Sequence, residues 1–384
     1  MELQQSREKH GKFHKRQANF ELLRIMAMMM VVTLHYLSKG GLLTGFEEEW
    51  YAGTYAAWLL EGFCASGVNV FVLLSGYFLV EAGYKWRKIL TLWLQVWFYS
   101  VGVLVVLVLA GVLQLSDMTI YNLLDFVFPI QTEHYWFATA YVFMYLFSPM
   151  LNAGMKAMTQ KQHKMIVLAL IAVFSMIKSV VPFNLNMDRY GYDVIWFLCL
   201  YLIAGYIRLY GIPFFTQPRN VSADSDNTAI RRKMFGKSVL TYMVATLSMF
   251  AVLMAVGTFY RLTGKLADFV TKSYQYNHIL NLAASVALFY AFYHIRVKGK
   301  LADMVCTVSP YVFGVYLLHE HIGLRYLWPQ WFAVHEYGQS FLFLPHLIVT
   351  VLVIFAAGIL VDYVRSLLFY GVETGIMCLC QKKE

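Results

Sequence analysis

The stretch ELLRIMAMMMVVTLHYL, residues 21–37, is apolar along most of its length, yet it contains Arg24 and His35. About 20 consecutive apolar residues are enough to cross the hydrocarbon core of a bilayer as a helix. Ionisable side chains inside such a helix are costly and usually mark a functional site. The stretch therefore predicts a membrane-spanning helix that carries part of a site.

The composition of the whole chain agrees with a membrane protein. Of its 384 residues, 59% are hydrophobic and only 14% are charged, and the mean hydropathy is +0.56. Soluble domains contain about 25% charged residues. Most apolar runs are hydrophobic on all sides and are about twice as long as a strand of a membrane barrel, so we expect helices.

Ten apolar runs predict an all-α, polytopic membrane helix bundle of about ten transmembrane helices. No cleavable signal peptide is evident, because residues 1–19 are polar and basic and no small-residue cleavage site follows the first run. The first run is therefore expected to stay in the membrane. The ten predicted spans are residues 20–38, 56–80, 89–113, 135–152, 165–182, 192–210, 239–260, 277–295, 307–324 and 341–368.

The basic residues predict the orientation of the bundle. The loops and chain ends lie alternately on the two sides of the membrane. One side contains 23 Lys and Arg, with Arg365 counted in the C-terminal end, and the other side contains 7. Cytoplasmic loops carry the excess, so both termini are expected in the cytoplasm. The net charge of +9 then lies beside anionic headgroups, and no nucleic-acid partner is expected. We expect a basic N-terminus (1–19), a transmembrane domain (20–368, cytoplasmic loop about 211–238) and a cytoplasmic tail (369–384).

Arg24 and His35 are predicted to share one helix face. Eleven residues turn an α-helix by about 20° more than three full turns and advance it by roughly 16 Å. An apolar wall of Met28, Val31 and Val32 is expected between them, with His35 toward the outer end. Two simpler interpretations remain open. Arg24 can be an anchor near a helix end that pairs with Glu21, and His35 can be a hydrogen-bonded interfacial histidine.

Other polar residues in or near the spans are candidate site residues. Each also has a simpler interpretation, namely helix packing, a solvated cytoplasmic turn or interfacial anchoring. The run His319–Glu320–His321 does not have a zinc-ligand spacing, and adjacent residues on a helix point apart, so we expect no metal. The candidates are Ser75, the basic turn Lys85, Arg87 and Lys88, Trp136, Tyr316 and His319.

Several motifs resemble those of the family-3 integral-membrane acyltransferases, bacterial inner-membrane enzymes that O-acylate surface carbohydrates. The opening FELLRIMAMMMVVTLH matches the family's acidic residue, arginine and histidine with Glu21, Arg24 and His35. The later matches are VFVLLSGYFL (70–79), the basic turn at 85–88, YWFATAYVFMYLFSP (135–149) and SPYVFGVYLLH (309–319). The resemblance covers nearly the whole chain in order.

This resemblance implies an O-acyltransferase in a bacterial plasma membrane. Acyl-CoA, expected to be acetyl-CoA, would be the co-substrate on the cytoplasmic side, and a hydroxyl of a surface carbohydrate or glycolipid the acceptor. His35 would be the general base, and a covalent acyl-histidine stays open. Cations would bind the CoA phosphates. The implied donor-site residues are Arg24, Lys85, Arg87 and Lys88, with Glu21 holding Arg24, and the supporting residues are Ser75, Trp136, Tyr316 and His319.

The chain departs from the family pattern in the basic turn, where Thr91 stands at the expected place of a second arginine. Lys lacks the bidentate fork of Arg, so the sequence leaves open which cation of the turn contacts CoA. A transporter or flippase for a carbohydrate or small solute is the alternative, although it predicts internal repeats and broken helices that the sequence lacks. A receptor with polar residues used for packing is a third interpretation. The acyl group, the acceptor and the oligomeric state stay undetermined.

Overall fold

The structure is a computed structural model that describes residues 17–181, 189–216 and 228–381. Every regular element in these ranges is helical, which confirms the predicted all-α class. The longer helices are α2 (Ala18–Lys39), α3 (Ala52–Cys64), α4 (Gly67–Leu79), α5 (Trp86–Leu109), α6 (Ile120–Val127), α7 (Trp136–Ala157), α8 (Gln160–Ile171), α10 (Val194–Tyr210), α11 (Thr228–Thr263), α12 (Ile279–Tyr293), α13 (Gly299–Val308), α14 (Val312–His319) and α17 (Phe343–Gln381). The short helical turns are η1 (Leu115–Asp117), η2 (Ala172–Met176), α9 (Ile177–Val180), η3 (Ala267–Phe269), η4 (Lys272–Tyr274), η5 (Ser309–Tyr311), α15 (Trp328–Trp331) and α16 (Val334–Tyr337).

Seven helical stretches in the described residues are long and apolar enough to cross a membrane. The chain is therefore a multi-pass membrane protein. Each of the ten predicted spans lies on a helix or on consecutive helices, but those that contain α7, α10 and α12 are not among the seven. The count of ten and the cytoplasmic placement of both termini stay predictions.

Three helix ends differ from the predicted boundaries of loops and spans, because apolar length does not determine where a helix ends. The predicted loop 211–238 includes the start of α11, because the charged segment at 228–238 continues the helix beyond its apolar part. Residues 217–227 of that loop lie outside the described residues. The last helix, α17, continues from the apolar run to Gln381. The ninth predicted span ends early, because α14 stops at His319.

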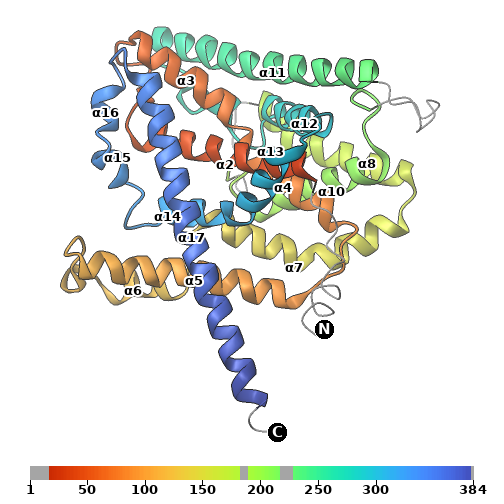
Figure 1. Cartoon of the computed structure of the whole chain (residues 1–384). Helices are drawn as coiled ribbons and strands as arrows, with labels where there is room; N and C mark the ends of the chain where they lie inside the picture. Colours follow the sequence, from red (N-terminus) through yellow and green to blue (C-terminus); the bar gives the residue numbers. More distant parts are fainter. Residues whose placement is uncertain (1–16, 182–188, 217–227, 382–384) are drawn as a thin grey trace.

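The opening stretch forms α2, which runs through the middle of the bundle (Figure 1). It contacts α3, α4, α12, α13, α14 and α17, and only Met26 and Ser38 of its 22 residues are exposed. The helix is thus buried in protein rather than in lipid. This position answers why so apolar a helix keeps ionisable side chains: they face other helices, where partners replace water.

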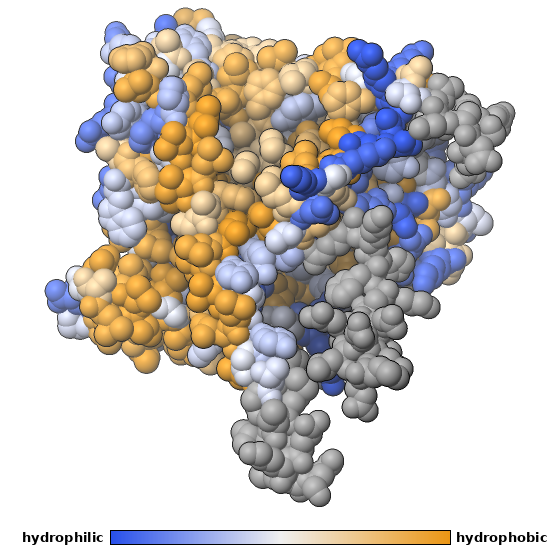
Figure 2. All heavy atoms as spheres, viewed as in Figure 1, coloured by the Kyte–Doolittle hydropathy of each residue, from blue (hydrophilic) through white to orange (hydrophobic). Residues whose placement is uncertain are grey.

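The outer surface of the bundle is apolar where lipid is expected. Figure 2 shows hydrophobic side chains gathered over α17 and over the α5–α6 region, and hydrophilic ones near the start of α11. The exposed residues include Val106 and Leu109 on α5 and Ile348 and Leu352 on α17. A soluble protein rarely leaves such large apolar areas uncovered, so this surface suits a bilayer.

Close packing of α14 against α17 depends on Gly314. A Cβ atom there would fall against the Asp362 side chain and 2.5 Å from the Tyr99 hydroxyl oxygen. Asp362 is fully buried and accepts hydrogen bonds from Tyr99 (3.1 Å) and from Arg365 (2.7 Å). The contact leaves no room for a methyl group beside this buried ion pair.

Gly314→Ala is therefore expected to destabilise the protein by about 1–3 kcal/mol, the usual cost of overpacking. The measurement is the midpoint of thermal unfolding in detergent. Gly236→Ala on α11 is the matched control, because a Cβ atom there meets nothing within 4 Å and Ala favours a helix over Gly. Equal midpoints for Gly314→Ala and the wild type would contradict this tight contact between α14 and α17.

Candidate active site

The predicted face of α2 lines a small internal cavity. Its wall includes Met28 and Val31, as predicted, together with His35. Val32, which was predicted to share this face, is buried but does not line the cavity. The cavity has a volume of about 30 Å³. Its other walls come from α4, α7, the segment before α12, and α14. They are formed by Val68, Phe71, Trp136, Phe137, Tyr276, Phe313 and Tyr316.

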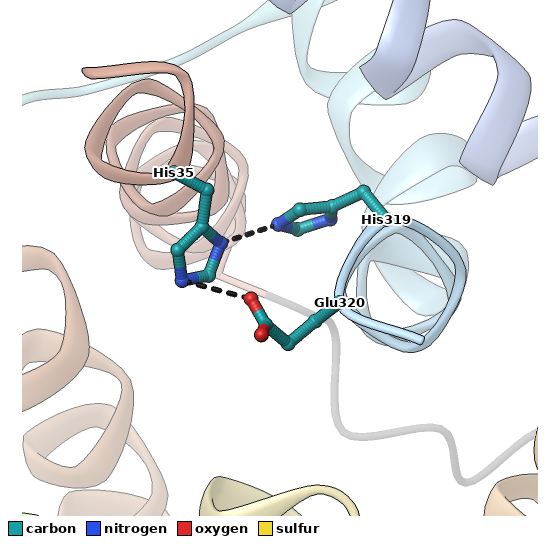
Figure 3. A group of neighbouring side chains, drawn as sticks. All are labelled: His35, His319 and Glu320. Atoms are coloured by element: carbon teal, nitrogen blue, oxygen red, sulfur yellow. Dashed lines mark hydrogen bonds and ion pairs between the residues drawn. The ribbon is translucent and has the colours of Figure 1, made fainter. Parts of the chain in front are cut away.

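His35 contacts two adjacent residues at the end of α14. Its Nδ1 lies 2.8 Å from Nε2 of His319, and its Nε2 lies 3.0 Å from a carboxylate oxygen of Glu320. Figure 3 shows both side chains pointing at the His35 ring from the facing helix. His319 and Glu320 are 2% and 5% exposed, so the contacts are shielded from water.

The hydrogen bonds determine the protonation of the two imidazole rings. Nδ1 of His319 lies 2.6 Å from the carbonyl oxygen of Val315, which can only accept, so this nitrogen carries a proton. In neutral His319 the other nitrogen, Nε2, is then an acceptor, and His35 must donate to it from Nδ1. Nε2 of His35 is left as the atom that gains or loses a proton, and in its protonated form it donates to the Glu320 carboxylate 3.0 Å away. His319, itself held by the carbonyl of Val315, thus orients the ring of His35, as a third group orients the base in known catalytic arrangements.

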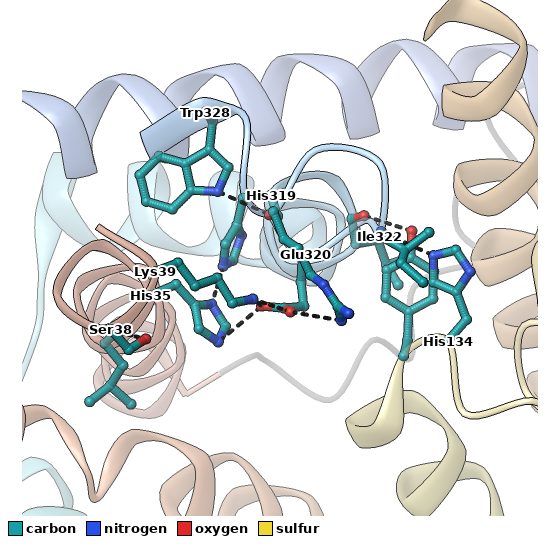
Figure 4. A network of polar contacts seen from close by, with 12 residues as sticks. His35, Ser38, Lys39, His134, His319, Glu320, Ile322 and Trp328 are labelled. Atoms are coloured by element: carbon teal, nitrogen blue, oxygen red, sulfur yellow. Dashed lines mark hydrogen bonds and ion pairs between the residues drawn. The ribbon is translucent and has the colours of Figure 1, made fainter. Parts of the chain in front are cut away.

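Two cations hold the Glu320 carboxylate in place. Lys39 donates to both of its oxygens, and Arg325 approaches one of them at 3.7 Å. Glu320 is thus an anion that can stabilise positive charge on His35. Figure 4 shows this network together with Trp328, whose indole N–H donates to the His319 carbonyl at 3.1 Å.

The prediction that His319 and Glu320 point apart is wrong. Because α14 ends at His319, Glu320 lies in the following turn and its side chain comes back to His35. Ligand atoms of His35, His319 and Glu320 lie within 4.8 Å of one another, and two imidazoles with a carboxylate are a donor set that zinc accepts. However, both Glu320 oxygens already accept from Lys39, so a divalent cation would have to displace a buried ammonium. The geometry favours a proton-handling group over a metal centre.

A second, more polar layer lies one helical turn from the cavity, toward the predicted cytoplasmic side. Arg24 is one turn from Met28, and its guanidinium bonds to Glu21 at 2.8 Å, so the predicted pair is present. Ser75 is one turn from Phe71 on α4, and Tyr141 is one turn from Phe137 on α7. Ser75 and the charge of Arg24 both interact with the Tyr141 side chain. Three helices therefore bring together a polar layer of Arg24, Ser75 and Tyr141 below the apolar cavity.

The basic turn lies at the end of the same column. Tyr145, one turn beyond Tyr141, makes 3.3 Å contacts with the backbone N–H and carbonyl of Lys85. The side chains of Lys85, Arg87 and Lys88 are exposed at the start of α5, and none forms an ion pair with another described residue. The turn thus offers free cations at the surface, joined to the buried polar layer through one face of α7.

A comparison with protein families decides what kind of site this is. The family model described as an acyltransferase domain matches residues 17–363, which is nearly the whole chain. This chain belongs to acyltransferase family 3. No curated protein and no solved structure gives a significant match. The resemblance inferred from the motifs is confirmed, and the protein is an enzyme, so the family assignment sets the transporter alternative aside.

The acyltransferase brings the predicted residues together in three groups. His35, His319, Trp136 and Tyr316 meet at the cavity or beside it. Glu21, Arg24 and Ser75 lie in the layer below, and the basic turn lies at the surface.

Three residues of the candidate site were not among the predicted site residues: Lys39, Glu320 and Tyr141. Glu320 is next to His319 in the sequence, but its contact depends on the helix end. Lys39 was counted only as a loop charge, and Tyr141 is one of 27 tyrosines. The spacing of four residues from Phe137 to Tyr141 and Tyr145 was the available signal.

Proposed function

We propose that this acyltransferase moves an acetyl group from cytoplasmic acetyl-CoA to a hydroxyl of a cell-surface carbohydrate or glycolipid, with His35 as general base. The observation that carries the proposal is the position of Nε2 of His35. It belongs to a ring that borders the cavity, its tautomer is set through His319, and it faces the buried anion Glu320. A hydroxyl needs such a base to become a nucleophile at neutral pH.

The proposed reaction proceeds without a metal. The acceptor hydroxyl enters between Nε2 of His35 and the Glu320 carboxylate, and it passes its proton to Nε2 as its oxygen attacks the thioester carbonyl carbon. Glu320 stabilises the imidazolium that results, because opposite charges at 3.0 Å attract strongly when shielded from water. The carbon–sulfur bond then breaks, and the thiolate of CoA takes the proton from His35. The products are an acetyl ester and free CoA, and His35 returns to its starting state.

The small cavity favours a short acyl group. A cavity of about 30 Å³ exceeds the roughly 10–15 Å³ that one water molecule needs on the same measure, so it accepts only a small group. The cavity therefore suits the methyl group of an acetyl unit and not a long acyl chain. Its lining is almost wholly apolar and aromatic beside His35, which suits a methyl group as well.

The polar column toward the basic turn supports donor entry from the cytoplasmic side. CoA carries phosphates, and charge-assisted hydrogen bonds from Arg and Lys are the strongest contacts that proteins make with phosphate. Arg24 lies at the end of this column nearer the cavity, and its side chain is 29% exposed. The cations of residues 85–88 lie at the end nearer the cytoplasmic surface. We propose that Arg24 contacts the part of CoA nearest the thioester arm.

Arg24→Gln is expected to raise KM for acetyl-CoA about tenfold, the effect of losing one hydrogen bond to a charged group. The change in kcat should be smaller, because Arg24 is roughly 16 Å along α2 from His35. Steady-state kinetics with labelled acetyl-CoA measures both constants. Arg232→Gln is the matched control, since Arg232 is exposed on the same predicted side but far from the column in sequence. An unchanged KM in Arg24→Gln would contradict the donor assignment.

A further inference from the structure

A second cavity, of about 510 Å³, lies at the end of the bundle that the charge distribution places outside. Its walls come from the loop before α3, from α3, from the segment after residue 189, and from the turns before α12. This volume is in the range of small-molecule binding sites, about 300–1,000 Å³. The lining residues are Leu43, Trp58, Glu61, Tyr190, Tyr192, Ala267, Asp268, Thr271, Tyr274 and Gln275.

Glu61 is the unexplained residue of this cavity. Its Oε2 atom is buried, and no described residue donates a hydrogen bond to it. A buried carboxylate oxygen without a donor is costly, because it loses water and gains nothing in return. The Glu61 side chain lines a cavity large enough for a ligand, so its carboxyl group is available to hydrogen-bond a ligand there.

The aromatic part of the wall is built rigidly around Glu61. The Tyr274 hydroxyl donates to the carbonyl of Trp58 at 2.8 Å, and the indole N–H of Trp58 lies 3.2 Å from the carbonyl of Thr44. The Trp58 and Tyr274 rings are 5.8 Å apart, and the absence of a side chain at Gly62 lets Tyr274 approach α3. These contacts hold Trp58 and Tyr274 in place on one side of the cavity.

The chemistry of the lining selects an uncharged polyhydroxyl ligand. Aromatic rings provide apolar faces beside polar edges, and carboxylate and amide groups accept and donate hydrogen bonds to hydroxyls. The exposed acidic group of the wall, Asp268, repels phosphates and acidic sugars. An uncharged sugar ring, with apolar C–H faces and hydroxyl edges, fits this set.

One layer of aromatic rings separates this cavity from the His35 site. Tyr192 lines the outer cavity, whereas Tyr276 and Trp136 line the cavity beside His35. The Tyr192 ring lies 4.5 Å from that of Tyr276 and 4.6 Å from that of Trp136, measured between centroids. The Tyr192 ring, packed on Tyr276 and Trp136, therefore separates a sugar in the outer cavity from the cavity beside His35.

We propose that the outer cavity around Glu61 binds the acceptor as an uncharged sugar unit, with a sugar hydroxyl donating to Glu61. This inference rests on the proposed function, and it adds where the acceptor binds and which class of sugar it contains. Movement of the Tyr192–Tyr276 layer would then bring a hydroxyl of the bound sugar to Nε2 of His35.

The test is isothermal titration calorimetry of the full chain in nanodiscs, which contain no sugar detergent. The probes are para-nitrophenyl glycosides of glucose, galactose, N-acetylglucosamine and glucuronic acid. The wild type is expected to bind at least one uncharged glycoside and to bind the glucuronide more weakly. Glu61→Gln is expected to weaken binding of the uncharged glycoside about tenfold, since the amide nitrogen cannot accept a hydrogen bond from a sugar hydroxyl.

Glu48→Gln is the matched control, because Glu48 is exposed in the loop before α3 and is expected to leave glycoside binding unchanged. Asp268→Asn serves as a second cavity variant if Glu61→Gln fails to fold, and binding of acetyl-CoA reports folding. Equal affinity in Glu61→Gln and the wild type would overturn the proposal. So would binding of no uncharged glycoside by the wild type. If either result is found while the same preparation still turns over acetyl-CoA, the acceptor site is wrong but the proposed acyltransferase function is not contradicted.

Discussion

His35→Gln is expected to lower kcat for acetyl transfer by roughly 10²–10⁴-fold, the contribution of a positioned general base. Gln is polar and can still donate to His319, but it cannot take up a proton at neutral pH. KM for acetyl-CoA should change much less, because the proposed phosphate contacts lie at the other end of the column. Steady-state kinetics with labelled acetyl-CoA and a saturating acceptor separates the two constants.

His335→Gln is the control for this variant. His335 is exposed, so its replacement is expected to leave kcat at the wild-type value. A kcat for His35→Gln within about threefold of the wild type would contradict the assignment of the base, since the lower end of the expected effect is far larger.

Glu320→Gln is expected to lower kcat by about 10²-fold or more while the substrates still bind. The amide keeps the shape of the side chain but loses the charge that stabilises protonated His35. It also leaves Lys39, whose side chain is only 13% exposed, without its anionic partner. Loss of one member of a buried ion pair costs about 3–5 kcal/mol, so the thermal midpoint should fall as well. Both quantities are measured on the same preparation.

A second substitution separates the loss of activity from the loss of stability. Lys39→Met in the Glu320→Gln background removes the unpaired ammonium, so the thermal midpoint should recover while kcat should not. Glu336→Gln, at an exposed position in the same part of the chain, is expected to behave as the wild type. Full recovery of kcat in the double variant would mean that Glu320 is only a structural counter-ion and does not stabilise the imidazolium of His35.

The sequence was sufficient for the parts of the molecule that depend on local periodicity. Arg24 and His35 are eleven residues apart on one helix, so their shared face and the wall of Met28 and Val31 follow from helix geometry alone. The family motifs led to the same residues. The apolar runs likewise predicted the positions of the membrane helices, because length and hydropathy decide which segments a bilayer accepts.

Features that depend on where a helix stops or on contacts between distant segments could not be predicted. Glu320 reaches His35 because α14 ends one residue earlier, and apolarity alone predicted a span continuing to residue 324. The pairing of Lys39 with Glu320 joins residues 281 positions apart. The outer cavity is assembled from four separate segments, so no single stretch of sequence indicates that Glu61 lines it.

The most direct test of acetyl transfer with His35 as the base is transfer of label by the purified protein in nanodiscs. The protein would receive radiolabelled acetyl-CoA and a crude extract of surface glycans and glycolipids, and label in the acceptor fraction and release of free CoA would be followed together. We expect label to enter the glycan or glycolipid as an alkali-labile ester, with one CoA released for each acetyl group transferred, and we expect His35→Gln to abolish the transfer. A wild-type protein that neither binds nor cleaves any acyl-CoA would contradict the proposed reaction.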